Sequence, residues 1–269
     1  MSLHDDIRSA ILANLKIKHD DEIIQLNNAL RLLAKHRCVL IQNTFIKNNG
    51  LSVLQGPLAG LNFLKTSAEG CHIPKLLGCY EQPLLPYIEK AIEGEYQAVV
   101  NIGSAEGYYA VGMALRMPNA VFHAFDLNEA AQAFCYELAK SNNVSERVQI
   151  GSLFETGDFE KFRDVETLIL CDIEGGEVDL LDPKAAPSLK KFDIIVEAHE
   201  GDCPGTIQAL LDRFRETHSV EIIYDSGHRN LYDVPSWFLK LSHLDQLLAT
   251  WEWRSASTPW LIMTKIKSD

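Results

Sequence analysis

The feature that most constrains this chain is an alternation of two patterns between residues 97 and 266. Short apolar runs rich in β-branched residues alternate with amphipathic helical segments, and the runs read AVVNI, AVFHAFD, RVQIG, TLILCDI, DIIVEAHE, VEIIYD and PWLIMTKI. A strand buried on both faces is apolar throughout, and a parallel neighbour needs a helix to cross back. The alternation therefore predicts an α/β fold with a doubly wound, mostly parallel seven-stranded sheet. A long insertion separates the last two runs, which is compatible with an antiparallel final strand.

The first fifty residues have helical periodicity instead. Two apolar stripes carry it, one of Ile7, Ile11 and Leu15 and one of Ile24, Leu26, Leu30, Leu33 and Leu40. Residues 50–78 are rich in Gly and Pro, which is typical of loops that build a pocket wall or lid. We expect residues 1–75 to form a helical arm with this wall segment, and 76–269 to form the Rossmann-like domain. The expected polar outer face of the arm favours packing, or a homodimer, over a direct role in substrate binding.

The charge of the chain bears on its partners. A formal net charge of -12 disfavours nucleic acid, because binding to phosphates requires clustered Lys and Arg, so a small neutral or cationic substrate fits better. No apolar run approaches the roughly 18 to 20 residues that span a bilayer, and the N-terminal stretch lacks the apolar block of a signal peptide. We therefore expect a cytoplasmic protein without a membrane partner. Six scattered cysteines without a CxxC pair disfavour a zinc or redox site.

The first strand-like run leads into a glycine loop, VVNIGSAEGYYAVG, at residues 99–112. Gly103 would allow a sharp turn out of the strand, Gly107 a close approach at the start of the next helix, and Ser104 can cap free N–H groups. In a doubly wound sheet the ligand lies at this edge. Asp126 ends the next strand, where a carboxylate commonly accepts hydrogen bonds from ribose hydroxyls. Together these features predict a cofactor that contains adenosine.

Two cofactors, NAD and S-adenosylmethionine, fit such a loop. The glycine spacing is GxxxG rather than the GxGxxG that cradles a pyrophosphate, and the loop starts about a hundred residues into the chain. Both details favour S-adenosylmethionine. An NAD(P)-dependent oxidoreductase and a non-catalytic binding protein with this fold remain the alternatives.

Four segments, VVNIGSAEGYYAVG, AFDLN, LILCDIEGGEVDLL and IIVEAHE, resemble the FkbM-type branch of the class I S-adenosylmethionine-dependent methyltransferases. They lie in register over roughly residues 75 to 200, and DIEGGE is the most specific of them. The resemblance implies a Rossmann-like methyltransferase. It suggests methyl transfer to a hydroxyl of a small molecule, such as a sugar or a secondary metabolite.

The resemblance also implies where the cofactor binds. The residues concerned are Asn101, Gly103, Ser104, Ala105, Glu106, Gly107, Asp126, Leu127, Ser152, Leu153 and Asp172. The loop would lie beneath the methionine part, Asp126 would hold the ribose, and Ser152 and Leu153 would border the adenine. Asn101 departs from the family pattern, which usually has an acidic residue there that binds the methionyl amine. Asp172 or Glu106 would then supply the missing charge.

The candidates for catalysis follow the fourth and fifth strand-like runs. Asp172 follows the fourth, and Glu197 and His199 follow the fifth, so the topology would place all three on the rim that faces the methyl group. His199 is the natural general base because its ordinary pKa is about 6.5. Two alternatives stay open: a histidine that only bonds locally, and a divalent cation held by Asp172, Glu197 and His199. Because this ligand spacing is nonspecific, we expect no metal.

Overall fold

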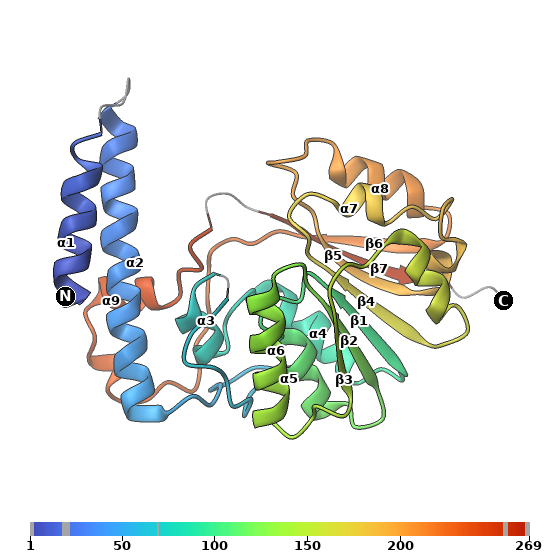
Figure 1. The fold of residues 1–269 in the computed structure, drawn as a ribbon, viewed down its shortest axis with the longest axis horizontal. Coiled ribbons are helices and arrows are strands. Elements are labelled where there is room, and N and C mark those ends of the chain that lie inside the picture. Colours follow the sequence, from blue (N-terminus) through green and yellow to red (C-terminus); the bar gives the residue numbers. More distant parts are fainter. Residues whose placement is uncertain (1–2, 18–21, 69, 255–257, 267–269) are drawn as a thin grey trace.

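A computed structural model describes residues 3–17, 22–68, 70–254 and 258–266. Its centre is one seven-stranded sheet with the strand order β3-β2-β1-β4-β5-β7-β6 (Figure 1). The strands are β1 (Ala98–Ile102), β2 (Val121–Phe125), β3 (Val148–Gly151), β4 (Thr167–Cys171), β5 (Asp193–Glu197), β6 (His218–Ile223) and β7 (Trp260–Lys265). All pairs are parallel except those of β7, which runs antiparallel to both β5 and β6. The predicted fold class is confirmed.

Helices cover both faces of the sheet. One face packs against α4 (Leu85–Ile92), α5 (Tyr108–Arg116) and α6 (Glu129–Ser141), and the other against α7 (Glu177–Leu180) and α8 (Thr206–Phe214). The remaining short helices are α3 (His72–Leu77), α9 (His243–Ala249) and the 3-10 helices η1 (Gln82–Leu84), η2 (Thr156–Phe162), η3 (Pro187–Lys191) and η4 (Phe238–Lys240).

The buried strands alternate their side chains between the two cores. In β1, Val100 and Ile102 enter the core beneath α7 and α8, whereas Val99 enters the core beneath α4, α5 and α6. Asn101 therefore points to the side of α5 and is 5% exposed. This alternation places a polar group beside the glycine loop, at the carboxyl end of the strand.

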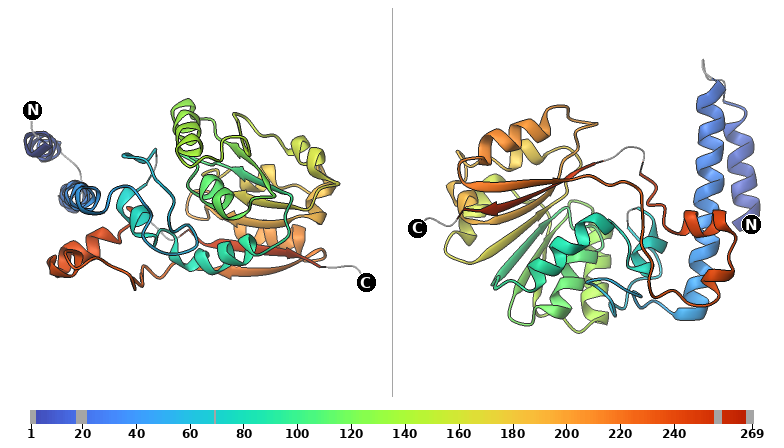
Figure 2. Two further views of the ribbon diagram at one scale, coloured as in Figure 1. Left: turned by 90° about the horizontal axis from the view of Figure 1, so that it is seen from below. Right: turned by 180° about the vertical axis from the view of Figure 1, so that it is seen from behind.

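The N-terminal arm is a helical hairpin of α1 (Leu3–Asn14) and α2 (Glu22–Asn49) that projects from one end of the molecule (Figures 1 and 2). The lower part of α2 is anchored, since Ile41 and Phe45 are buried and Arg37 pairs with Asp245 of α9 at 2.6 Å. Its upper part contacts α1. The expectation of a polar outer face is wrong, because several large apolar side chains of the arm are exposed, among them Leu26 and Leu30.

The segment after the arm contains less loop than expected, because α3 forms within it. Val53, Leu58 and Phe63 join the same core as residues of the sheet, so this segment packs as a wall against α5 and the first strands. The division into two parts at residue 75 stays a prediction. Among the described residues, no helix has the length and apolarity needed to cross a membrane.

Candidate active site

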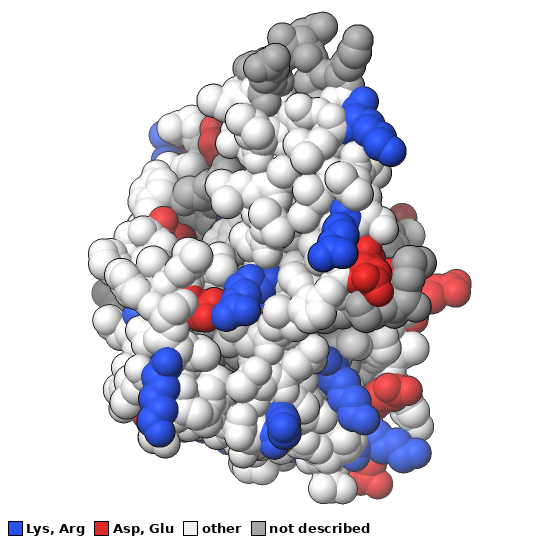
Figure 3. All heavy atoms as spheres, turned by 90° about the vertical axis from the view of Figure 1, so that its left-hand side faces the viewer, with Lys and Arg blue, Asp and Glu red and all other residues white. Residues whose placement is uncertain are grey.

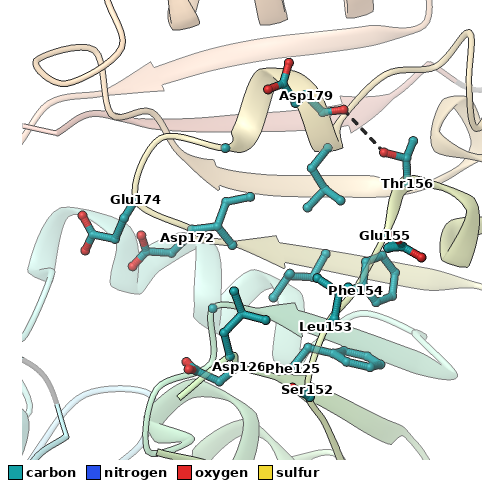
Figure 4. Close-up of a pocket in the computed structure, with 16 residues that line it drawn as sticks. Phe125, Asp126, Ser152, Leu153, Phe154, Glu155, Thr156, Asp172, Glu174 and Asp179 are labelled. Atoms are coloured by element: carbon teal, nitrogen blue, oxygen red, sulfur yellow. Dashed lines mark hydrogen bonds between the residues drawn. The ribbon is translucent and has the colours of Figure 1, made fainter. Parts of the chain in front are cut away.

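A cavity of about 550 Å³ opens at the carboxyl ends of β1, β2, β3 and β4. Figure 4 shows its walls, which come from the loops that follow these four strands. Six of the residues predicted to bind the cofactor line it: Gly103, Asp126, Leu127, Ser152, Leu153 and Asp172. Residues far apart in the sequence thus converge on one site, and the volume suits a ligand of nucleoside size.

The glycine loop has the backbone geometry that the sequence suggests. Gly103 has φ 75°, and a Cβ there would lie 1.5 Å from the carbonyl oxygen of Asp172. Gly107 has φ 85°, and a Cβ there would lie 2.5 Å from Sγ of Cys135. Only glycine combines this left-handed conformation with such close neighbours. The loop can therefore turn tightly between β1, β4 and α6.

The loop uses most of its own N–H groups. The amides of Gly103 and Ser104 both donate to the carbonyl of Phe125, that of Ala105 donates to Asp126, and that of Gly107 donates to the carbonyl of Ser104. Four of the five N–H groups of residues 103–107 thus have protein acceptors. A loop that binds a pyrophosphate presents such amides to the ligand instead.

Asp126 links the loop to the next strand. Its Oδ2 accepts from Ala105 and its Oδ1 from the amide of Asn128, both at 2.8 Å. A carboxylate has about four acceptor positions, so both oxygens can still accept hydroxyl donors from the cavity. The side chain is fixed before any ligand arrives.

The cavity is acidic. Five carboxylates line it, those of Asp126, Glu155, Asp172, Glu174 and Asp179, and no Lys, Arg or His occurs among the described residues of its wall. An anionic ligand group would meet repulsion here. A ligand with a positive group is electrostatically favoured.

The cavity also has an apolar side. The apolar side chains of Leu127 and Leu153 are 71% and 59% exposed at the cavity wall. Beside them, Phe154 packs edge-on against Phe125 at a centroid distance of 4.8 Å. Two exposed leucines at one cavity leave apolar surface that a flat, uncharged ring system can cover.

The remaining predicted loop residues are divided between two places. Asn101, Ser104 and Ala105 line a smaller adjoining pocket of about 50 Å³, which also contains Gly103 and Asp172. Gly107 lies at the start of α5, away from either lining.

The Glu106 carboxylate points elsewhere. It is fully buried, lies 2.5 Å from Nζ of Lys75, and accepts from the hydroxyl of Ser67 and the amide of Ala68. Because it is bound to these partners, Glu106 cannot replace the acidic residue that the family pattern has at position 101. Of the two predicted substitutes, Asp172 and Glu106, only Asp172 lies in the same pocket as Asn101.

His199 lies buried behind the rim of the cavity. Its Nδ1 donates to Oε1 of Glu177 at 2.7 Å, while Nε2 lies 3.1 Å from Glu174, 3.7 Å from Asp172 and 3.9 Å from Glu197. Burial lowers the pKa of His199, but the hydrogen bond to Glu177 and the charges of the surrounding carboxylates outweigh it and raise the pKa. The structure thus brings the three predicted catalytic residues together, although His199 and Glu197 lie outside the cavity wall.

Asp172 and Glu197 differ in their environments. Burial, followed by the charges of Glu197 and Glu81, raises the pKa of Asp172 well above its ordinary value. Its Oδ1 is buried and has no hydrogen-bond partner within the part of the chain that the structure describes. Glu197 is instead paired with Arg254 at 2.5 Å. Asp172 therefore binds a proton more readily than an ordinary aspartate does.

Two sets of side chains have the chemistry to hold a cation. Asp172, Glu174 and His199 form one, and Glu81, Asp172 and Glu197 form the other, with the ligand atoms of each set within 4.8 Å of one another. In the second set Arg254 already compensates charge, since it pairs with both Glu81 and Glu197. In the first set, protonated His199 would compensate the negative charge of Asp172 and Glu174. The expectation that no metal takes part stays a prediction.

Sequence reasoning missed several residues of the site. The partner of His199 is Glu177, which belongs to the DIEGGE segment but was not among the predicted site residues. Glu81 and Arg254 join the network from segments 173 residues apart, and no local pattern connects them. Phe154 could have been found, since it directly follows Leu153 in the loop after β3.

No protein-family model matches the chain, and no curated protein sequence does either. Solved structures do resemble it. The METTL16 MTase domain has 12% identity and a TM-score of 0.49, covering 88% of this chain and 80% of that one. Human methyltransferase 10 domain containing protein has 10% identity and a TM-score of 0.48, and the match covers 86% of this chain and 96% of that one. The O-methyltransferase TomG from Streptomyces achromogenes has 11% identity and a TM-score of 0.43, and the match covers 68% of this chain and 80% of that one. At such identities the likeness shows the fold alone.

Proposed function

We propose that this protein is an S-adenosylmethionine-dependent methyltransferase. The observation that carries the proposal is the composition of the main cavity, with five carboxylates, no described basic residue and two exposed leucines. S-adenosylmethionine combines an apolar adenine, ribose hydroxyls, a sulfonium and an ammonium group. The adenine suits the exposed Leu127 and Leu153, and the ribose hydroxyls suit Asp126. The sulfonium and ammonium groups suit the acidic end of the cavity at Asp172. A pyrophosphate, as in NAD, would face the same carboxylates while four of the five loop amides are already bonded within the protein.

The FkbM-type assignment belongs to this proposal as well. Its support is the DIEGGE segment, because Asp172, Glu174 and Glu177 of that segment all lie around His199. Glu174 has φ 57°, a conformation that non-glycine residues adopt rarely and mostly at functional sites.

For the acceptor we propose a hydroxyl of a small uncharged or cationic molecule, such as a sugar or a secondary metabolite. The acidic cavity and the net charge of -12 would both repel a polyanion. His199 is the proposed general base. Since Glu174 is the exposed partner of Nε2, an approaching hydroxyl would displace that side chain and donate its proton to Nε2. The protein would otherwise align the hydroxyl with the sulfonium methyl and exclude water.

Calorimetry with S-adenosylhomocysteine, NAD and NADP tests the cofactor. We expect S-adenosylhomocysteine alone to bind, and Leu153→Asp to weaken it about tenfold or more, because a charge would replace the apolar wall. Leu239→Asp is the matched control, since Leu239 is also exposed but lies outside the cavity. Binding of NAD without binding of S-adenosylhomocysteine would overturn the proposal. A screen of acceptors with a labelled methyl donor then tests the acceptor class.

A further inference from the structure

The upper half of α2 carries an exposed apolar seam formed by Ile23, Leu26, Leu30 and Leu33. These side chains are 59%, 61%, 65% and 50% exposed. Their spacing of three, four and three residues is that of the a and d positions of a coiled coil, which pack against another helix. The same stripe continues downwards to Arg37, where α9 covers it through the ion pair with Asp245. The seam is thus the more exposed part of a stripe that packs against α9 lower down.

We propose that the seam binds a second copy of this chain, so that two hairpins form an antiparallel four-helix bundle. The positions of the seam are symmetric about residue 28: Ile23 and Leu33 are equally far from it, as are Leu26 and Leu30. When two such helices pack antiparallel about a two-fold axis, Ile23 meets Leu33 of the second copy and Leu26 meets Leu30. Every a position then faces a d position, as isologous antiparallel packing requires.

α1 widens the same face. Hydrogen bonding between Gln25 and the carbonyl of Asn14 marks the side of α2 that faces α1. At 100° per residue the seam lies about 120° around α2 from Gln25. Measured in the same sense from Asn14 of α1, Leu12 lies about 160° and Leu15, just after the helix, about 100° around the axis. Because the helices run antiparallel, these rotations bring both sets to one side, and Leu12 and Leu15 are exposed there. Figure 3 shows this end of the molecule, where uncharged side chains cover most of the surface.

The size of the face is adequate for a dimer. From Ile23 to Arg37 the helix rises about 21 Å, and two packed helices are about 20 Å wide. Joining two such faces would bury on the order of 1,000 Å², where specific interfaces begin.

Charge favours this end of the molecule for self-association. Residues 1–49 contain seven Lys or Arg and five Asp or Glu, a net charge of +2, which leaves -14 on residues 50–269. Two copies that meet through the arms keep their acidic sheet domains apart, whereas contact between those domains would be opposed by like charge. This argument and the symmetry of the seam favour a second copy over another partner.

The first test is the mass of the 269-residue chain in solution, measured by light scattering after gel filtration at micromolar concentration. We expect twice the chain mass of 30.2 kDa. Leu30→Glu should yield the monomer, because four-helix packing would bury the new carboxylates, while unchanged circular dichroism shows that the chain is folded. Ile266→Glu is the matched control: Ile266 is similarly exposed but directly follows β7, which lies in the sheet domain away from the arm (Figure 1), and its variant should stay dimeric. A monomeric wild-type protein, or a dimer unaffected by Leu30→Glu, overturns the proposal.

Crosslinking tests the register. In a Cys203→Ser background, which removes the exposed native thiol, the double variant Ile23→Cys/Leu33→Cys should form a covalent dimer on mild oxidation. The two positions are about 15 Å apart along one helix, so an internal disulfide is excluded. Leu33→Cys alone should stay uncrosslinked in the antiparallel arrangement. A covalent dimer of that single variant would indicate parallel helices and overturn the proposed geometry.

Discussion

Nδ1 of His199 lies 2.7 Å from Oε1 of Glu177, a carboxylate without solvent exposure. The second oxygen of Glu177 is buried and has no hydrogen-bond partner among the described residues, whereas Oε1 also accepts from the amide of Gly175 at 3.0 Å, so that amide helps to hold the carboxylate in place. The bond fixes which ring nitrogen carries a proton in the neutral imidazole and leaves Nε2 facing the rim. Glu177 is thus a positioning residue for the proposed base.

Glu177→Gln should separate this positioning role from a purely structural one. Loss of the carboxylate lowers the raised pKa of His199, while the amide oxygen can still accept from Nδ1. Because the base acts when deprotonated, the rise of kcat with pH should move to lower pH, and the plateau should fall about tenfold. Binding of S-adenosylhomocysteine should not change. Glu174→Gln should shift the profile less, because that side chain is 75% exposed and screened; identical profiles for wild type and Glu177→Gln would contradict the role.

Gly103→Ala should destabilise the protein by about 3 kcal/mol or more. The new Cβ would lie 1.5 Å from a backbone oxygen and the residue would keep a positive φ, so β1 and β4 must separate locally. Gly157→Ala is the matched control, since nothing lies within 4 Å of a Cβ there, and its change should stay within about 0.5 kcal/mol. Urea unfolding measures both. Equal stabilities would show that the loop tolerates a side chain.

Lys75→Met should cost about 3 to 5 kcal/mol of unfolding free energy, because it leaves the buried Glu106 carboxylate without its cation. The double variant Lys75→Met/Glu106→Gln should be more stable than this single variant, as it removes the buried charge too. Arg163→Ala breaks an exposed pair with Asp164 and should change stability by less than about 1 kcal/mol. A double variant no better than Lys75→Met would show that charge is not the cause.

Glu81 should make stability depend on pH. Burial, with the charge of Glu197 adding to it, raises the pKa of Glu81 to about 7. Between pH 4.5 and 7 the folded state therefore holds a proton that the unfolded state has lost, and the contribution of Glu81, on the order of 3 kcal/mol, disappears as the pH rises through this range. Urea unfolding across these pH values should show a flatter dependence for Glu81→Gln. A slope equal to that of the wild type would rule out Glu81 as its source.

Chelation tests the two sets of potential cation ligands. Because a proton and Arg254 can balance the carboxylates around Asp172, methyl transfer should persist after EDTA treatment and dialysis. The measurement is the initial rate with the identified acceptor, with and without added Mg²⁺. A loss of activity restored by Mg²⁺ would assign a cation to one of these sets.

The sequence allowed prediction of those parts of the molecule that follow from local pattern. All seven strands were recognisable as apolar runs, and Gly103 and Asp126 were found because loop, strand and helix follow one another within about 25 residues. The direction in which the Glu106 side chain points was not predictable, since it depends on Lys75 from a separate helix. The exposure of Leu26 and Leu30 could not be predicted from the sequence either. Periodicity identifies an apolar stripe without showing what, if anything, covers it.

The place of β7 has a consequence for synthesis of the chain. This strand lies between β5 and β6, although it is the last of the seven to leave the ribosome. Until then β5 is an open sheet edge and β6 has no neighbour to pair with, so an unfinished chain presents unpaired backbone groups beside an apolar surface. Nascent chains that stop before residue 260 should therefore depend on chaperones, and the emergence of β7 becomes the step that closes the sheet.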